Sequence, residues 1–184
     1  MPIAPSPSPR LRGFAPHARA DARVLILGSM PGARSLQAQR YYAHPQNRFW
    51  PFMGELVGAA PSLPYGERLL RLATAGIALW DVLASCERDG SLDSAIRDEG
   101  AQANDFVAFF DAHRRIRRVL FNGAKAESSF RRRVLPGLAD AGRLTLVRLP
   151  STSPANASQR GDAKLAAWRD ALSDAGVDVG ARQD

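Results

Sequence analysis

Four short, largely apolar runs constrain the fold of this chain most strongly, because each is bounded by turn residues or charge. They read RVLIL, GIALW, RVLF and LTLVRL and occupy residues 23–27, 76–80, 118–121 and 144–149. Such runs are typical of parallel strands that are buried on both faces. Helical patterns fill the intervening segments, so the sequence predicts an α/β protein, a three-layer α/β/α fold with a central four-stranded parallel sheet.

The helical segments are recognised by apolar residues at helical spacing. Asn104 is expected to cap the helix that buries three phenylalanines, Phe106, Phe109 and Phe110. The other expected helices cover residues 47–57, 64–73, 124–134 and 162–173.

With 184 residues, the chain is expected to form one domain. Residues 1–12 are rich in Pro and Ser and are predicted to be a flexible tail, with order beginning near Phe14. The domain is placed at 13–176 and a C-terminal tail at 177–184. No apolar run is long enough to span a membrane, and the first residues lack an export signal. We therefore expect a cytoplasmic, nucleoid-associated protein.

The formal net charge is +7 and the sequence pI is about 10.6. This balance favours a nucleic-acid partner, although a biased genome composition produces the same balance. Cys86 is the only cysteine, which excludes an intramolecular disulfide and a cysteine-ligated iron–sulfur or zinc site. The three histidines, His17, His44 and His113, lack metal-ligand spacing. We therefore expect no metal and no cofactor.

Ligands bind beyond the carboxyl ends of strands in such sheets, so the loops after the four runs should converge. The first loop, Gly28 to Gly32, reads GSMPG and is a tight turn with exposed amides. It is neither a P-loop nor a dinucleotide motif, and a plain strand-to-helix turn is its alternative interpretation.

Two further segments are rich in groups that bind nucleic acid. Residues 41–50 read YYAHPQNRFW and combine aromatic rings, amides, a histidine and an arginine. We assign Phe49 and Trp50 of this segment to the core. Residues 151–156 read STSPAN and suit a rigid loop that holds a phosphate backbone, or an ordinary helix-capping loop.

Together these segments resemble the uracil-DNA glycosylase superfamily, whose motifs follow the first and last strands. The set GSMPG, YYAHPQNRFW, GIALWDVLASCERDGSLDSAI and STSPAN is most similar to the deoxyinosine (hypoxanthine) branch. The stretch AHPQNRFW is similar to the mismatch-specific uracil glycosylases. The resemblance spans roughly residues 14–172. It implies a monofunctional enzyme that flips a deaminated or mispaired base out of double-stranded DNA and hydrolyses its N-glycosidic bond.

The resemblance also implies site residues, with one departure. Met30 stands where relatives carry the Asp or Asn that handles the catalytic water, and a thioether cannot act as a base. We assign the water to Asn47, whose alternative role is to cap the following helix. Tyr42 is expected to stack on the flipped base. Ionised Asp81 is expected to accept the N1–H of hypoxanthine.

The remaining expected contacts lie in the same motifs. Gly28, Ser29 and the backbone near Met30 would contact the base, and His44 would donate to the base or a phosphate or serve structurally. Ser151 replaces the catalytic His or Asn of the last motif. Ala155 replaces the leucine that relatives use as a wedge, so either Asn156 is expected to fill the vacated stack or the enzyme acts on already weakened pairs. Ser153, Ala155 and Asn156 are expected to contact the DNA. Ser151 is expected to contact it as well, in addition to its catalytic place.

Three other functions stay open at this point. The AHPQNRFW match favours a uracil or thymine mismatch glycosylase, and Met30 favours a non-catalytic module that binds lesions. An unrelated α/β hydrolase is disfavoured because no nucleophile elbow is present. The basic runs at 114–118 and 131–133 are expected on a solvated face, and neither lysine falls in a motif, which argues against a lyase. A monomer is expected by default.

Overall fold

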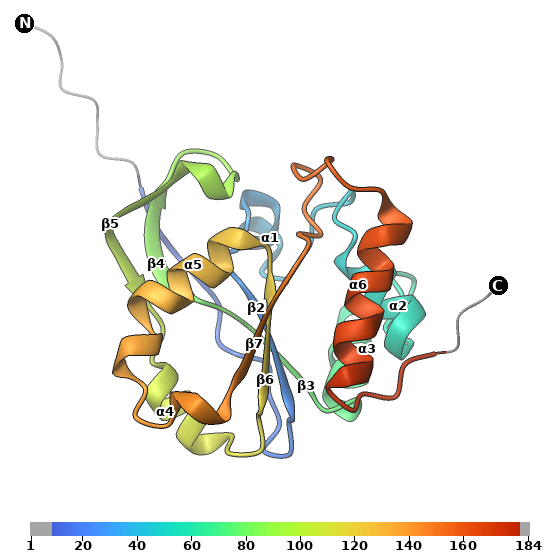
Figure 1. The fold of residues 1–184 in the computed structure, drawn as a ribbon. Coiled ribbons are helices and arrows are strands. Elements are labelled where there is room, and N and C mark those ends of the chain that lie inside the picture. Colours follow the sequence, from blue (N-terminus) through green and yellow to red (C-terminus); the bar gives the residue numbers. More distant parts are fainter. Residues whose placement is uncertain (1–8, 181–184) are drawn as a thin grey trace, which may run out of the picture.

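The computed structural model describes residues 9–180. Its centre is the predicted four-stranded, all-parallel sheet, in the order β3-β2-β6-β7 (Figure 1). The four apolar runs form its strands, and β2, β3 and β6 are almost entirely buried. The predicted fold class is therefore confirmed. The strands are β2 (Val24–Gly28), β3 (Ile77–Asp81), β6 (Arg118–Asn122) and β7 (Thr145–Leu149).

Helices cover the two faces of this sheet, because alternate strand residues point to opposite sides. Val24 and Ile26 face one hydrophobic cluster, which α2 (Phe49–Val57), α3 (Tyr65–Thr74) and α6 (Gly161–Asp174) complete. Leu25 and Leu27 face the other cluster, which α4 (Phe106–Ala112) and α5 (Ala124–Arg133) complete. Figure 1 shows the resulting three layers.

A second, three-stranded antiparallel sheet was not predicted. It has the order β1-β4-β5 and consists of β1 (Arg10–Arg12), β4 (Leu83–Arg88) and β5 (Ile96–Ala103). Strand β5 reads IRDEGAQA, which lacks the apolar run of a buried strand, and its pairing with β4 contains register shifts. The short 3-10 helix η1 (Asp93–Ala95) lies at the tip of this β4–β5 hairpin.

Both ends of the domain differ from the expected boundaries. Arg10–Arg12, placed in a flexible tail, pairs with β4, so order begins before Phe14. The guanidinium of Arg10 donates to Ser85 Oγ and to the Gly100 carbonyl. At the other end, Val177 is buried and the amide of Gly180 donates to the Leu56 carbonyl. Residues 1–8 and 181–184 of the predicted tails lie outside the described residues.

The five predicted helices all form, with ends that differ by one or two residues where bounds were predicted. The cap of α4 is Asp105, whose carboxylate accepts from the amide of Ala108, so the expected cap at Asn104 is wrong. Asn104 instead donates to the Asp81 carbonyl. The short helix α1 (Ala33–Ala38) was not predicted. Within residues 9–180, no helix has the length and apolar character needed to cross a bilayer.

Candidate active site

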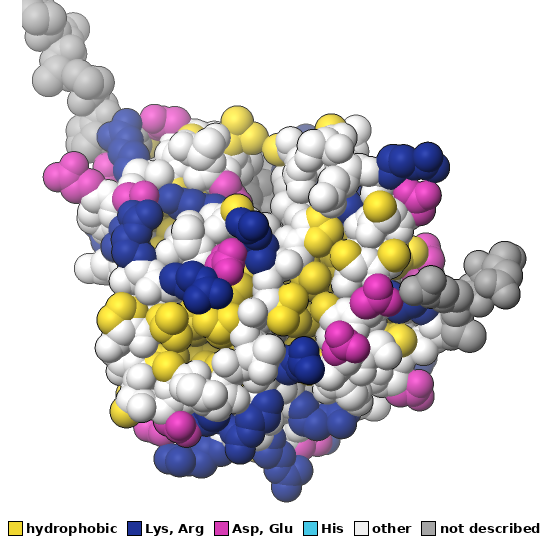
Figure 2. Space-filling model, viewed as in Figure 1, with side chains coloured by type: hydrophobic (Ala, Val, Ile, Leu, Met, Phe, Trp, Pro, Cys, Tyr) yellow, Lys and Arg dark blue, Asp and Glu magenta, His cyan; other side chains and the backbone are white. Residues whose placement is uncertain are grey.

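A cleft of about 1270 Å³ lies at the carboxyl ends of the central strands. The hairpin tip and the β2–α1 loop border it on one side, and the loop between β7 and α6 borders it on the other, at the top of Figure 1. Figure 2 shows the surface hollowed between these two sides. Every residue that the sequence analysis assigned to the site lines this cleft, namely Gly28, Ser29, Met30, Tyr42, His44, Asn47, Asp81, Ser151, Ser153, Ala155 and Asn156.

Gly28 creates space at the end of β2 for two polar groups. It pairs with Asp81 of β3 in register. A Cβ atom at this position would lie 2.4 Å from Asp81 Oδ1 and 3.2 Å from Tyr42 Oη. Both polar groups therefore occupy the volume that any other residue would fill, and Gly28 shapes the floor of the cleft through its missing side chain.

Asp81 is a buried carboxyl group with unused hydrogen-bonding capacity. It is 4% exposed, and its Oδ2 has no hydrogen-bond partner among the described residues. Burial, followed by the negative charge of Asp93, raises the pKa of Asp81 to about 7, although Arg88 opposes this. A buried polar atom without a partner is rare in native proteins, so a water or a bound ligand is the expected partner of Oδ2.

Asp93 is a cleft residue that the sequence analysis missed. It begins η1 at the hairpin tip, and Ser29 Oγ donates to its Oδ1 at 2.5 Å. Burial raises the pKa of Asp93, while the Ser29 hydrogen bond and the charges of Arg88 and Lys125 oppose the change. In the sequence, Asp93 stood out only as a member of the motif at residues 76–96. This motif does not indicate that the hairpin folds back to Ser29.

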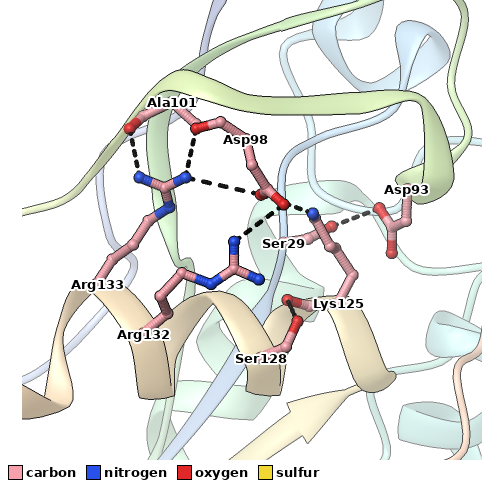
Figure 3. Close-up of polar contacts among 8 residues, drawn as sticks. All are labelled: Ser29, Asp93, Asp98, Ala101, Lys125, Ser128, Arg132 and Arg133. Carbon is pink, nitrogen blue, oxygen red and sulfur yellow. Dashed lines mark hydrogen bonds and ion pairs between the residues drawn. The ribbon is translucent and has the colours of Figure 1, made fainter.

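Charged side chains hold the hairpin against α5, as Figure 3 shows. Asp98 of β5 pairs with Lys125 at 2.8 Å and with Arg132 at 3.1 Å. Arg133 donates to the carbonyls of Asp98 and Ala101. The hydrogen bond from Lys125 is the largest cause that lowers the pKa of Asp98. This cluster fixes the strand that follows η1, and so it helps to position Asp93.

Arg88 joins the hairpin to the first loop from inside. It is 3% exposed, and its Nη2 donates to the Pro31 carbonyl at 2.6 Å while its Nε donates to the Gly90 carbonyl at 2.9 Å. Because one guanidinium holds both backbones, the first loop and the hairpin tip form a single rigid wall of the cleft.

Tyr42 presents an aromatic ring at the cleft. Its ring stacks on Phe49 with centroids 4.0 Å apart, and its backbone has a φ of +53°, which is uncommon for a residue other than glycine. The hydroxyl is buried and meets no partner at hydrogen-bond distance within residues 9–180. Burial, then the charge of Asp81, raises the pKa of Tyr42, while the neighbouring Asn122 opposes the change. Phe49 and Trp50 are buried in the core, as predicted.

Asn47 and His44 line the cleft beside Tyr42. Asn47 Oδ1 accepts from the amide of Phe49 at 3.0 Å, so the alternative contact with the start of α2 is present. His44 Nδ1 accepts from the amide of Gln46 at 3.1 Å. A carbonyl oxygen has a second lone pair, and the Asn47 contact therefore leaves capacity to orient a water.

Met30 is largely a core residue. It is 5% exposed and belongs to the hydrophobic cluster that contains Trp80 and Leu83. Met30 therefore occupies the motif position at which relatives carry Asp or Asn, but its thioether cannot take over the handling of the water.

The loop of residues 150–159 is held by two buried polar anchors. Asn122, at the end of β6, exchanges two hydrogen bonds of 2.9 Å with Thr152, which is fully buried. Lys164 of α6 donates to the carbonyls of Ser151 and Asn156, and burial, then Arg48, lowers its pKa. Neither anchor was identified from sequence. Pro154 and Ala155 remain exposed between them.

The site residues of this loop differ in how much they are already engaged. Ser151 Oγ accepts from the amide of Ser153 at 3.2 Å, and Ser153 Oγ accepts from the amide of Ala155 at 3.3 Å. Asn156 Oδ1 accepts from Ser158. The hydroxyl protons of Ser151 and Ser153 can therefore still be donated to a ligand.

The two basic runs lie at different distances from the cleft. Arg118 is the first residue of β6, whereas Asn122, its last, lines the cleft. The run at 114–118 therefore lies at the opposite end of the sheet, where basic side chains gather in Figure 2. Arg131 and Arg148 do lie on the cleft side, and both pair with Glu127. Residues 9–180 contain no cluster of three or more metal-ligating side chains.

Comparison with known proteins identifies the class of this fold and site. The family model of the uracil DNA glycosylase superfamily matches residues 15–172. The chain therefore belongs to the uracil DNA glycosylase superfamily, and the resemblance seen in its motifs is confirmed.

Two relatives and one solved structure are similar to this chain over most of its length. The chain is 38% identical over 146 residues to the hypoxanthine DNA glycosylase of Methanosarcina acetivorans, which covers 79% of this chain and 87% of that protein. It is 39% identical over 116 residues to the hypoxanthine DNA glycosylase of Methanosarcina barkeri, covering 62% and 72%. A solution NMR structure of a candidate uracil DNA glycosylase from Methanosarcina acetivorans superposes with a TM-score of 0.74 at 32% identity, covering 91% of this chain and 99% of that one.

Proposed function

We propose that this protein is a monofunctional DNA glycosylase that excises hypoxanthine from double-stranded DNA and leaves an abasic site for base excision repair. The observation that carries the proposal is the buried, unpartnered Asp81 carboxyl beside the Tyr42 ring, at the floor of a cleft. Membership of the superfamily and the similarity to two hypoxanthine DNA glycosylases support it.

The flipped base would bind between the aromatic ring and the carboxyl group. Tyr42 is backed by Phe49, so its other face is available for stacking on a base. Ionised Asp81 would accept a hydrogen bond from N1–H of hypoxanthine through Oδ2. Adenine has no hydrogen on N1 and cannot donate this bond. Gly28, Ser29 and the backbone of Met30 would form the floor beneath the base.

Residues of the other cleft segments would support hydrolysis. The bond between the base and sugar C1′ breaks with its electron pair leaving on the base, and a water oxygen binds C1′. The water loses one proton to solvent and the departing base takes up one, so the products are neutral hypoxanthine and an abasic sugar. Asn47 would orient this water, and Ser151 and His44 would donate hydrogen bonds to the departing base or a phosphate. Ser153, Ala155 and Asn156 would contact the DNA backbone from the loop that Lys164 holds.

A single-turnover assay tests the proposal. Duplexes that carry one deoxyinosine, one deoxyuridine or one thymine mismatch are incubated with excess enzyme, and alkali reveals abasic sites. Wild type is expected to cleave the deoxyinosine duplex, and Asn47→Ala is expected to lower the cleavage rate by about a hundredfold, because loss of one positioning group lowers a rate on that order. Asn156→Ala is the matched control at the rim and is expected to weaken binding more than chemistry.

The alternatives have distinct outcomes in this assay. An ionised Asp81 can also accept the N3–H of uracil, which keeps a uracil or thymine mismatch glycosylase as the second candidate. Cleavage mainly at deoxyuridine would favour the uracil or thymine mismatch glycosylase. Tight binding without cleavage of any duplex would favour a non-catalytic lesion-binding module. The expected monomeric state and nucleoid location stay predictions.

A further inference from the structure

One large hydrophobic side chain is exposed at the mouth of the cleft. Three such side chains are prominent among the described residues, namely Leu70, Leu92 and Val107, which are 59%, 54% and 52% exposed. Scattered exposed hydrophobic residues are normal. Leu92 differs from the other two because it alone lines the cleft, at the tip of the hairpin.

Hydrogen bonds hold this tip on both sides of Leu92. Ser91 Oγ accepts from the amide of Ala33 at 2.9 Å, and Asp93 accepts from Ser29 Oγ at 2.5 Å. The Leu92 carbonyl accepts from the amide of Ala95 at 3.0 Å. The Leu92 backbone is therefore fixed to the first loop, and a bound duplex would meet a preorganised apolar side chain rather than a loose one.

The rigid wall extends beyond the tip. Arg88 joins Gly90 to Pro31, and the Asp98 cluster in Figure 3 fixes the following strand to α5. Such fixing is useful for a side chain that must press between stacked bases, because unstacking a base step costs a few kcal/mol and a loose loop would yield instead.

The opposite rim exposes no leucine, isoleucine, phenylalanine or methionine among residues 150–159. Its exposed residues there are Pro154, Ala155, Ala157, Ser158 and Gln159. Pro154 is the one with an apolar side chain larger than a methyl group, and because its ring is bonded back to the backbone it reaches less far than Leu92. When a base is rotated out of a duplex, the vacated space in the stack must be filled, and proteins that separate base steps insert Leu, Ile, Phe, Met or Pro. Leu92 has this chemistry and stands beside the cleft that would receive the base.

We propose that Leu92 is the wedge that enters the DNA stack when the damaged base occupies the cleft. This proposal rests on the proposed glycosylase function. It assigns the wedge to the hairpin tip instead of the loop at residues 151–156, so the two rims divide their work. The hairpin side separates the bases, and the opposite loop holds the backbone.

The test compares Leu92→Ala with Leu70→Ala, a leucine of similar exposure that does not line the cleft. Single-turnover cleavage is measured on deoxyinosine paired with cytosine in a duplex and on deoxyinosine opposite an abasic-site analogue. Leu92→Ala is expected to slow cleavage of the paired substrate by about tenfold or more, and of the unpaired one by less than about twofold, because only the paired base must be pushed out. Leu92→Met is expected to retain most of the rate, and Leu70→Ala all of it.

A second readout does not depend on cleavage. A 2-aminopurine placed beside the lesion gains fluorescence when its stacking is broken. Wild type is expected to raise this fluorescence on binding, and Leu92→Ala to raise it much less at saturating protein. Equal cleavage ratios and equal fluorescence for Leu92→Ala and wild type would overturn the wedge while leaving the glycosylase intact. If wild type cleaves nothing, the proposed function fails, and the fluorescence comparison alone still decides whether Leu92 enters the stack.

Discussion

The two sheets of this protein are built by different rules. The central parallel sheet is made of continuous apolar runs, and both its faces are covered by helices. The β1-β4-β5 sheet contains register shifts, and β5 is mostly polar. It is held to the rest by Arg88, by the Asp98 cluster and by four buried residues that join the first hydrophobic cluster, namely Leu83, Cys86, Ile96 and Ala101. The first sheet supplies stability and places the strand ends, whereas the second supplies Leu92 and Asp93 at the cleft. A mostly polar hairpin can therefore form a wall of the site when a few buried residues join the shared core and charged side chains fix the rest.

The largest expected effect on stability lies in the central sheet. Phe121 of β6 is fully buried, and its ring lies 5.2 Å from that of Phe130. Phe121→Ala is expected to lower the free energy of unfolding by about 3–5 kcal/mol, because it leaves a cavity in the core. Urea unfolding measures this. A loss below about 1 kcal/mol would show that the sheet is less tightly packed than its burial indicates.

The largest expected effect on activity without loss of stability lies at Asp81. Asp81→Ala is expected to lower the single-turnover rate on deoxyinosine by about a hundredfold, because the base loses a charged acceptor in a buried site. The melting temperature is expected to be unchanged or higher, since a buried carboxyl with an unpartnered oxygen is removed. A destabilised variant would instead assign Asp81 a structural role.

The pH dependence tests whether the two sheets are electrostatically coupled. If ionised Asp81 reads the base, the rate should rise as pH increases through about 7, the raised pKa of this carboxyl. Asp93→Asn removes a charge that raises this pKa, so the rise should move to lower pH. An unshifted profile would mean that the hairpin carboxyl does not act on Asp81.

The same pKa has a consequence for folding. The native Asp81 keeps its proton up to about pH 7, whereas the unfolded chain loses it near the ordinary value of about 3.9. The protonated carboxyl therefore contributes stability at low pH that is lost as pH rises between these values. The difference in stability between Asp81→Asn and wild type should therefore favour the variant more at pH 8 than at pH 5. Thermal melts of both proteins at the two pH values measure this difference.

The smallest expected effect concerns the ionic anchor. Asp98 is 41% exposed, so solvent screening limits its ion pairs, and Asp98→Asn is expected to lower the free energy of unfolding by less than about 1 kcal/mol. Hydrogen exchange at residues 89–96 should nevertheless quicken, because the hairpin loses its attachment to α5. Arg114→Gln, which removes an exposed ion pair far from the hairpin, is the control. Unchanged exchange at the hairpin would show that Arg88 holds it unaided.

Local sequence patterns were sufficient for the central sheet, its helices and the family motifs. The apolar run at 23–27 can be read as a strand because burial on both faces demands continuous apolar residues. Strand β5 could not be read in this way, because its stability comes from pairing with β4 and from Asp98, and these contacts join residues far apart in the chain. Asn104 failed as a cap for a similar reason, since its amide is taken by the Asp81 carbonyl.

By itself, the sequence determined the α/β fold, the superfamily and the motif residues that line the cleft, because periodicity and motif order are local properties of the chain. Only the tertiary structure decided that Asp93 lies against Ser29, that Lys164 holds the loop at 151–156, and that Leu92 stands exposed at the mouth. Each depends on a polar or exposed side chain whose partner is distant in sequence. Such partners leave no periodic signal, since it is the closing of the fold that brings them together.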